Sequence, residues 1–329
     1  MILSSPRKYL SRVTVAILML LLALPAVALA GAYPEKPVRL VLPYGPGGGT
    51  DVVARPLAHF MSERTGVQFI ADNRGGANGN IAMEIVARAP ADGYTLGLML
   101  TGQLAINPAL YRNIAYDPVK DFAPVTLLGS TPYFLAVNRA VAAATFDEFL
   151  KLARDKPGAL SYGSTGSGSG LHLSMELLKS MAKIDLVHVP YKSAGVAITD
   201  LLAGQVQAMF LSYGTSSAHY RAGRLRLLAA TSAQRSRALP DIPTLAEAGV
   251  AGYESGVWYA LIAPRGTPAA VIKRLHAECT ELLKTGLGAQ MTADGITPAG
   301  STPEALTAYI KSESTKWAQV VKRSGATVD

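Results

Sequence analysis

The chain has 329 residues, a formal net charge of +8 and a single cysteine, Cys279. One cysteine excludes an internal disulfide, and basic residues scattered singly argue against a nucleic-acid groove. A chain of this length can bury about three quarters of its unfolded surface, so core burial in one large or two medium domains must stabilise it.

The first thirty residues have the pattern of a secretory signal peptide. Arg7, Lys8 and Arg12 give a positive start, an apolar run covers 13–24, and the small residues Ala28 and Ala30 supply a cleavage pattern. The apolar run is shorter than the roughly 20 residues that cross a bilayer, which disfavours the alternative of an uncleaved anchor. We expect export and cleavage after about Ala30, which leaves a net charge of +5.

From residue 38 onward, short apolar strands alternate with amphipathic helices, which is typical of an α/β fold. A strand is predicted over 38–43, followed by a glycine-rich turn over 45–49 and a helix from 50 or 51 to about 64. Gly66 ends this helix. A strand over 67–70, a loop over 73–79, a helix ending near 88 and a strand over 94–100 follow.

The same order recurs from residue 145, where Thr145 and Glu148 form a capping box at the start of a helix. A strand over 160–163 leads through a second glycine-rich loop, 164–170, into a helix ending near 181. Further strands are predicted over 186–189, 206–211, 225–231 and 257–263, and further helices over 194–203, 215–222, 268–284 and about 301–322.

Two strand–glycine loop–helix units about 120 residues apart predict two similar lobes. We place residues 31–131 together with 253–329 in a discontinuous first lobe, and residues 132–252 in the second lobe. Two chain crossings between lobes make a hinge, and a cleft at a hinge is the usual geometry for closing around a ligand.

The two glycine loops are candidate anion sites. Each exposes backbone N–H groups at a helix start, where the helix dipole favours negative charge. The alternative is that the glycines only form tight turns. Neither loop has a P-loop ending or a dinucleotide fingerprint, and the chain contains no Gly-x-Ser-x-Gly elbow. The five histidines lie far apart in sequence, so no metal site is predicted.

A series of short stretches, in order along the chain, carries a family resemblance. These are Tyr33 to Arg39, Pro43-Tyr-Gly-Pro-Gly-Gly-Gly-Thr-Asp51, Asn73-Arg-Gly-Gly-Ala-Asn-Gly79, Ala89 to Thr95, Ile106 to Tyr111, Tyr162 to Gly166 with Leu171 and His172, His188-Val-Pro-Tyr-Lys192, Ala203 to Val206, Pro240 to Thr244, and Trp258 with Ala263 and Pro264. With these stretches the sequence resembles the Bug family of solute-binding receptors of tripartite tricarboxylate transporters. The resemblance implies a two-lobe, type II periplasmic binding fold, with each lobe a mixed sheet flanked by helices. It also implies a monomer in the periplasm that closes on a small organic carboxylate and is neither an enzyme nor dependent on a cofactor.

The resemblance also implies which residues bind the ligand. Gly47, Gly48, Gly49, Thr50 and Asp51, with the facing loop that contains Asn78, would grip one carboxylate through backbone N–H groups and ordered water. Thr101 and Gln103 would line the same lobe, and Ser164, Thr165, Ser169 and His172 would line the other.

Five of the candidate residues have two interpretations or a role that the family does not define. Tyr44 and Tyr191 are walls for the ligand or ordinary packing residues. His172 is a helix-start packing residue or a ligand contact. Asp51 is a helix cap or a group that favours a ligand with an amino group. Ser212 matches no fixed family contact and is a candidate specificity position.

Three functions fit these observations to different degrees. The first is a receptor that delivers a carboxylate to a tripartite tricarboxylate-type transporter. The second is a periplasmic sensor that feeds a membrane signalling protein, and the third is an exported hydrolase, for which the sequence offers no activated nucleophile.

Overall fold

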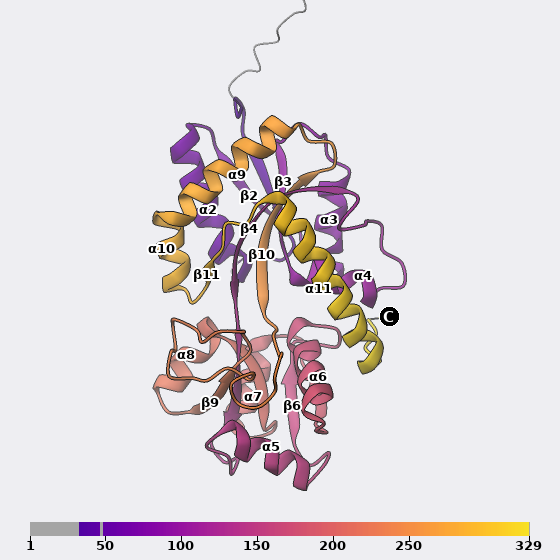
Figure 1. Cartoon of the computed structure of the whole chain (residues 1–329), viewed down its shortest axis with the longest axis vertical. Helices are drawn as coiled ribbons and strands as arrows, with labels where there is room; N and C mark the ends of the chain where they lie inside the picture. Colours follow the sequence, from indigo (N-terminus) through magenta and orange to yellow (C-terminus); the bar gives the residue numbers. More distant parts are fainter. Residues whose placement is uncertain (1–32, 47–48, 329) are drawn as a thin grey trace, which may run out of the picture. The chain divides into compact units, whose positions relative to one another are not determined.

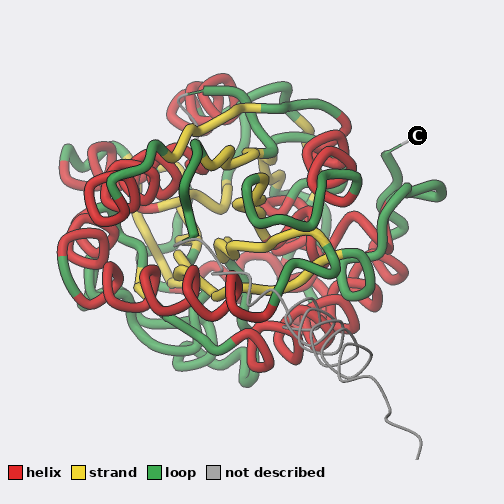
Figure 2. Tube along the Cα trace, turned by 90° about the horizontal axis from the view of Figure 1, so that it is seen from above, coloured by secondary structure: helices red, strands yellow, loops and turns green. Residues whose placement is uncertain are grey.

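Two mixed β-sheets, each flanked by helices, organise the computed structural model (Figure 1). The structure describes residues 33–46 and 49–328, so the predicted signal peptide and both Gly47 and Gly48 lie outside the described residues. The chain divides after Glu35, and the fold is that of the unit from Lys36 onward. Figure 2 shows helices on the outside of the strands in this unit.

The first sheet has six strands in the order β11-β4-β10-β3-β1-β2. β1 lies parallel to both β2 and β3, whereas β10 is antiparallel to β3 and β4, and β11 is antiparallel to β4. The strands are β1 (Val38–Leu42), β2 (Phe69–Asn73), β3 (Thr95–Leu100), β4 (Phe122–Thr131), β10 (Val257–Pro264) and β11 (Thr297–Pro298). Its helices are α2 (Gly49–Thr65), the short η1 (Ala77–Gly79), α3 (Asn80–Ala87), the π-helical η2 (Gly102–Ile106), α4 (Asn107–Leu110), α9 (Ala269–Lys284), α10 (Gly286–Ala293) and α11 (Pro303–Ser324).

The second sheet has five strands in the order β7-β6-β8-β5-β9. β6 is parallel to β7 and β8, and β5 runs antiparallel to β8 and β9. The strands are β5 (Tyr133–Asn138), β6 (Ser161–Ser164), β7 (Val187–Pro190), β8 (Ala208–Ser212) and β9 (Leu225–Ala230). Its helices are α5 (Phe146–Asp155), α6 (Gly170–Ala182), α7 (Ala194–Ala203) and α8 (Tyr213–Arg221). We call each sheet with its helices a lobe.

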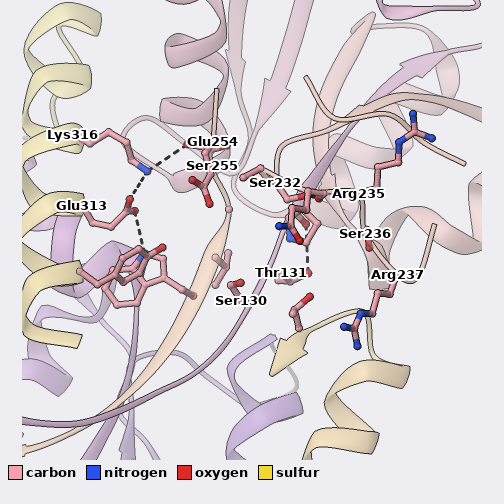
Figure 3. Close-up of a pocket in the computed structure, with 18 residues that line it drawn as sticks. Ser130, Thr131, Ser232, Arg235, Ser236, Arg237, Glu254, Ser255, Glu313 and Lys316 are labelled. Carbon is pink, nitrogen blue, oxygen red and sulfur yellow. Dashed lines mark hydrogen bonds and ion pairs between the residues drawn. The ribbon is translucent and has the colours of Figure 1, made fainter. Parts of the chain in front are cut away.

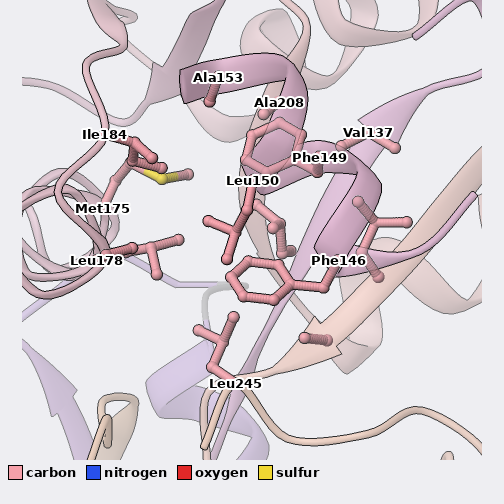
Figure 4. Packing of buried hydrophobic residues seen from close by; sticks show 14 of the residues in the cluster. Val137, Phe146, Phe149, Leu150, Ala153, Met175, Leu178, Ile184, Ala208 and Leu245 are labelled. Carbon is pink, nitrogen blue, oxygen red and sulfur yellow. The ribbon is translucent and has the colours of Figure 1, made fainter. Parts of the chain in front are cut away.

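Apolar side chains at helical spacing attach α5 to the second sheet. Phe146, Phe149, Leu150 and Ala153 follow one face of the helix, as the 3.6-residue period requires. Figure 4 shows this face packed against residues of α6 and of the sheet. Thr145 caps the helix through its side chain, which accepts the N–H of Glu148, as the capping box predicted.

The mixed, two-lobe α/β architecture agrees with the expectation, but the sequence analysis missed β4 and β5. β4 contains Pro124 and Gly129, two residue types that argue against a central strand. Its pairing with β10 accommodates Pro124 through a register shift, and a side chain at Gly129 would lie 2.6 Å from the carbonyl oxygen of Thr297. The second strand also begins and ends later than predicted, at Phe69 and Asn73.

The chain passes from the first sheet to the second between β4 and β5, and it returns between β9 and β10. Thr231 holds the two crossings together. Its hydroxyl accepts the N–H of Tyr133 and donates to the carbonyl of Ser255, each at a distance of 2.8 Å. The finer division at residues 131/132 and 252/253 stays a prediction.

Candidate functional site

A cavity of about 680 Å³ is lined by residues from both lobes. From the first lobe come Tyr44, Asn78, Leu100, Thr101, Gly102 and Ile106, and from the crossings come Tyr133, Gly256 and Val257. The second lobe contributes Thr165, Gly168, Ser169, Gly170, Leu171, Lys192, Ser193, Ala194, Leu211, Ser212 and Thr215. We call this space the central cavity.

Parallel strands explain why these residues meet. β1, β2 and β3 run in the same direction, so the segments that follow them lie at one edge of the first sheet. β6, β7 and β8 do the same in the second sheet. Ligand sites in α/β folds form outside the carboxyl ends of parallel strands, and here both sheets direct such ends at the central cavity.

Six of the predicted site residues line the central cavity: Tyr44, Asn78, Thr101, Thr165, Ser169 and Ser212. The others described, which are Gly49, Thr50, Asp51, Gln103, Ser164, His172 and Tyr191, are not among its lining residues. Gly47 and Gly48 fall in the part of the chain that the structure does not describe.

Gln103 lies behind the first-lobe residues that line the central cavity, which we call the first-lobe wall, and it bonds to two of them. Its side chain is 0% exposed, and its Nε2 donates to Tyr44 Oη over 2.9 Å and to the Asn78 carbonyl over 2.8 Å. Its Oε1 accepts the N–H of Leu100 over 3.1 Å. Tyr44 in turn donates to Asn78 Oδ1, and burial raises the pKa of Tyr44. A buried amide that satisfies three partners fixes the orientation of two lining side chains.

Thr101 ties the end of β3 to the crossing strand β10. Its Oγ1 accepts the N–H of Trp258 at a distance of 3.0 Å and donates to the carbonyl of Gly256 at a distance of 3.3 Å. Because Gly256 also lines the central cavity, this side chain connects the first-lobe wall to the hinge.

Asp51 lies in the first turn of α2 and faces partners within the protein. Its Oδ1 accepts from Asn73 Nδ2 over 3.2 Å and lies 3.5 Å from Arg55 Nε. Asp51 therefore has its charge offset by Arg55, and the residues around it form a separate surface depression with His59 and Asp294.

Ser164 and His172 shape the second glycine loop from beneath. Gly168 donates its N–H to His172 Nδ1 over 3.0 Å, and Ser164 Oγ lies 2.6 Å from His188 Nε2. The two histidine rings stack with centroids 4.0 Å apart. Burial lowers the pKa of His172, and burial followed by the neighbouring His172 lowers the pKa of His188 to about 4. Both rings are therefore neutral supports of a loop that lines the cavity.

Tyr191 faces away from the central cavity. Its hydroxyl donates to Asp200 Oδ2 over 2.9 Å, and a side chain at Gly163 would lie 3.4 Å from its ring. Of the two interpretations for this tyrosine, the geometry favours packing.

The second-lobe wall is built from helix starts. α6, α7 and α8 all begin at the central cavity, and Ser169, Ser193 and Ser212 stand at their N-cap positions. Ser169 and Ser193 accept N–H groups of their own helices, whereas the Ser212 side chain makes no capping bond. Helix N-termini favour anions, so this wall attracts negative charge.

Lys192 is the one charged side chain among the described residues that line the central cavity. Lys192 was not among the site residues predicted from the sequence, and neither were Ser193, Thr215 and Tyr133. The sequence could have pointed to Lys192 and Ser193, because they lie between a predicted strand and a predicted helix. The two glycine loops have the same position relative to their strands and helices.

A second cavity, of about 290 Å³, is lined by residues from both crossings and from α11 (Figure 3). Gly256 and Val257 line both cavities and so form part of the wall between them. The second cavity has charged groups of both signs. Arg235 pairs with Glu247 at a distance of 2.8 Å, and Lys316 pairs with Glu313. None of the predicted ligand residues lines it, so we take the central cavity as the site.

Comparison with known proteins identifies the family. Residues 53–326 match the family model described as the tripartite tricarboxylate transporter family receptor. The chain belongs to this receptor family. The receptor is 38% identical over 292 residues to a UPF0065 protein from the tcbD-tcbE intergenic region of Pseudomonas sp. strain P51, covering 88% of this chain and 87% of that protein. It is 34% identical over 299 residues to protein BugT of Bordetella pertussis, covering 90% and 92% of the two chains.

Solved structures agree with the fold of the receptor. The Rhodopseudomonas palustris protein Rpa4515, solved with adipate, is 37% identical with a TM-score of 0.80 and covers 90% of this chain and 99% of its own. MatC from the same organism, solved with bound malate, is 31% identical with a TM-score of 0.75 and covers 88% and 100%. Members of this family are periplasmic substrate-binding receptors, not enzymes, which confirms the resemblance and the predicted fold class.

The described residues contain neither a helix that could span a membrane nor a cluster of metal-ligating side chains. No helix in them has the length and apolar character that crossing a membrane requires. No group of three or more His, Cys, Asp or Glu side chains in them is arranged to hold a metal ion.

Proposed function

We propose that the receptor, after cleavage of residues 1–30, captures a small organic carboxylate in the central cavity and delivers it as a monomer to a tripartite tricarboxylate-type transporter. The observation that carries the proposal is the chemistry of the cavity wall. Three helix starts and Lys192 face the cavity, and none of the described lining residues has a carboxylate. The bound adipate and malate of two related structures support the same ligand class.

We further propose that the ligand contacts the six predicted residues that line the cavity, together with the glycine turn at 45–49. Tyr44 and Asn78, which both bond to Gln103, and Thr101 present neutral polar groups on the first lobe. The Tyr44 and Thr101 hydroxyls already donate within the protein, whereas the Asn78 amide has a second proton beyond its bond to Asn107 Oδ1. Thr165, Ser169 and Ser212 offer hydroxyls on the second lobe. The Asn78 amide and the second-lobe hydroxyls suit a carboxylate because they donate without requiring a buried counter-charge.

A panel of mono- and dicarboxylates tests this function by thermal shift and isothermal titration calorimetry. A ligand at a hundredfold excess over its dissociation constant should stabilise the fold by about 2.7 kcal/mol. Neutral sugars serve as the control and should leave the transition unchanged. The proposal fails when no carboxylate moves the transition and a neutral sugar does.

A site variant separates cavity binding from general stabilisation. Thr165→Val removes a lining hydroxyl at nearly constant volume, and Thr315→Val makes the same change on an exposed face of α11. We expect the first variant to weaken carboxylate binding and the second to bind like the parent. Equal affinities in both variants would place the ligand elsewhere.

A further inference from the structure

Residues on both sides of Lys192 are anchored, whereas none of the residues that the structure describes is a partner of the Lys192 side chain. Tyr191 donates its N–H to the carbonyl of Ser164 over 3.0 Å and its hydroxyl to Asp200, and Ser193 accepts the N–H of Val196. Both flanking residues are thus anchored. The Lys192 ammonium itself makes no hydrogen bond or ion pair with any residue that the structure describes, although it lines the central cavity.

The two walls of the cavity differ in charge. The first-lobe wall presents Tyr44, Asn78 and Thr101, which are neutral, and the second-lobe wall presents Lys192. Apolar side chains from both lobes and the crossing strand, including Leu100, Leu211 and Val257, complete the lining. A cavity of about 680 Å³ has room for more than one carboxylate group, since small-molecule sites span roughly 300–1,000 Å³.

We propose that Lys192 is a specificity-determining residue that makes the receptor prefer ligands with two anionic groups over ligands of the same length with one. This inference rests on the proposed carboxylate function. One carboxylate is bound at the first lobe, where the Asn78 amide keeps a proton beyond its bond to Asn107 Oδ1, and the second pairs with the Lys192 ammonium. Apolar lining residues accommodate the carbon chain between the two charged ends.

The preference follows from the charges available in the cavity. A second carboxylate that enters the cavity loses water, and a cation within hydrogen-bonding reach offsets that loss. To reach the ligand, the Lys192 side chain gives up no partner among residues 33–46 and 49–328, which the structure describes. A methyl ester in place of the second carboxylate gains nothing from the ammonium.

The experiment is a thermodynamic double cycle. Lys192 is substituted, one carboxylate of the ligand is replaced by an ester, and the two changes are then combined. The probes are linear dicarboxylates from succinate to suberate, together with malate, each compared with its monomethyl ester by titration calorimetry. The variants are Lys192→Met, which keeps the aliphatic length and removes the charge, and Lys192→Arg, which keeps the charge. Lys156→Met is the matched control, because Lys156 is an exposed lysine of the same lobe that does not line the cavity.

We expect Lys192→Met to weaken the best dicarboxylate by about tenfold and its monoester by less than about twofold, because only the charged hydrogen bond is lost. Lys192→Arg should keep the preference, and Lys156→Met should match the parent. The parent's preference should also shrink as salt is raised. Equal losses for diacid and monoester, or a parent that binds both equally, would overturn the inference while leaving carboxylate binding intact. Failure of every carboxylate to bind would instead overturn the proposed function and this inference with it.

Discussion

Gly168 lines the central cavity and gives its N–H to His172 Nδ1, so the shape of this wall depends on an unprotonated ring nitrogen. The groups that face the two stacked rings come from α6 and β6: Glu176 and Lys179 act on both rings, and Tyr162 stacks on His188. Burial is the largest cause, and it outweighs the opposing effect of Glu176, so the pKa of each ring lies below the ordinary histidine value of 6.5. A lowered folded-state pKa means that the folded protein resists protonation more than the unfolded chain does.

We predict that the free energy of unfolding falls as the pH is lowered from 6.5 toward about 4, the window set by the pKa of His188. In this window the unfolded chain binds protons that the folded protein does not, so stability rises with pH. Urea unfolding at several pH values measures the slope. His172→Asn keeps an acceptor for Gly168 that does not titrate and should give a shallower slope. An unchanged slope in this variant would show that the histidine stack does not control acid stability.

At the scale of elements, α11 is joined to β10 through one buried carboxylate. Glu313 Oε2 accepts the indole N–H groups of Trp258 and Trp317, each over 3.1 Å, and its Oε1 pairs with Lys316. The α11 residue Trp317 belongs to the same apolar cluster as Leu173 of α6, so this helix packs against both lobes. The glutamate orients the helix, and the apolar contacts bind it.

We expect Glu313→Met to lower the free energy of unfolding by about 2–4 kcal/mol, because two buried indole donors lose their acceptor. Glu313→Gln keeps an acceptor oxygen and should cost less. Chemical denaturation followed by tryptophan fluorescence measures both. A Met variant as stable as the parent would mean that the indoles find other acceptors and that the carboxylate does not orient α11.

At the scale of the whole molecule, the hinge passes between the two cavities. Gly256 lines both, and a Cβ at this position would meet the carbonyl oxygen of Thr131 at 2.6 Å. The two crossings therefore lie so close together at Gly256 that only glycine fits there without a clash. Thr231 and Thr101 bond to the adjoining backbone on either side of this approach.

Gly256→Ala should force the two crossings apart, lower the free energy of unfolding by about 1–3 kcal/mol and weaken carboxylate binding. The obstacle is a backbone atom, so rotating a side chain cannot relieve it. Gly195→Ala is the matched control, since a Cβ there meets nothing within 4 Å. Denaturation and calorimetry compare the two, and identical results for both would show that the crossings tolerate separation.

Much of the site was predictable, because glycine loops and strand ends are local features. The family resemblance implied Thr165 and Ser169, and Ser212 was selected because it ends a predicted strand. All three follow a strand or precede a helix, and the parallel strands bring such positions to one edge. The resemblance implied Gln103 and His172 as well, yet they lie behind the wall. The turn of a side chain toward or away from a cavity depends on the packing around it, which a local pattern does not contain.

Most of the strands and helices, the second-lobe glycine loop, the capping box at Thr145 and the family follow from the sequence by itself, because each rests on the identity of neighbouring residues. Only the tertiary structure decided that Pro124 and Gly129 lie inside a strand, since β10 and β11 supply the pairing that tolerates them. It also decided that Lys192 is the charged residue of the described cavity wall. Charge in a cavity is a sum over segments distant in sequence, and only folding brings those segments together.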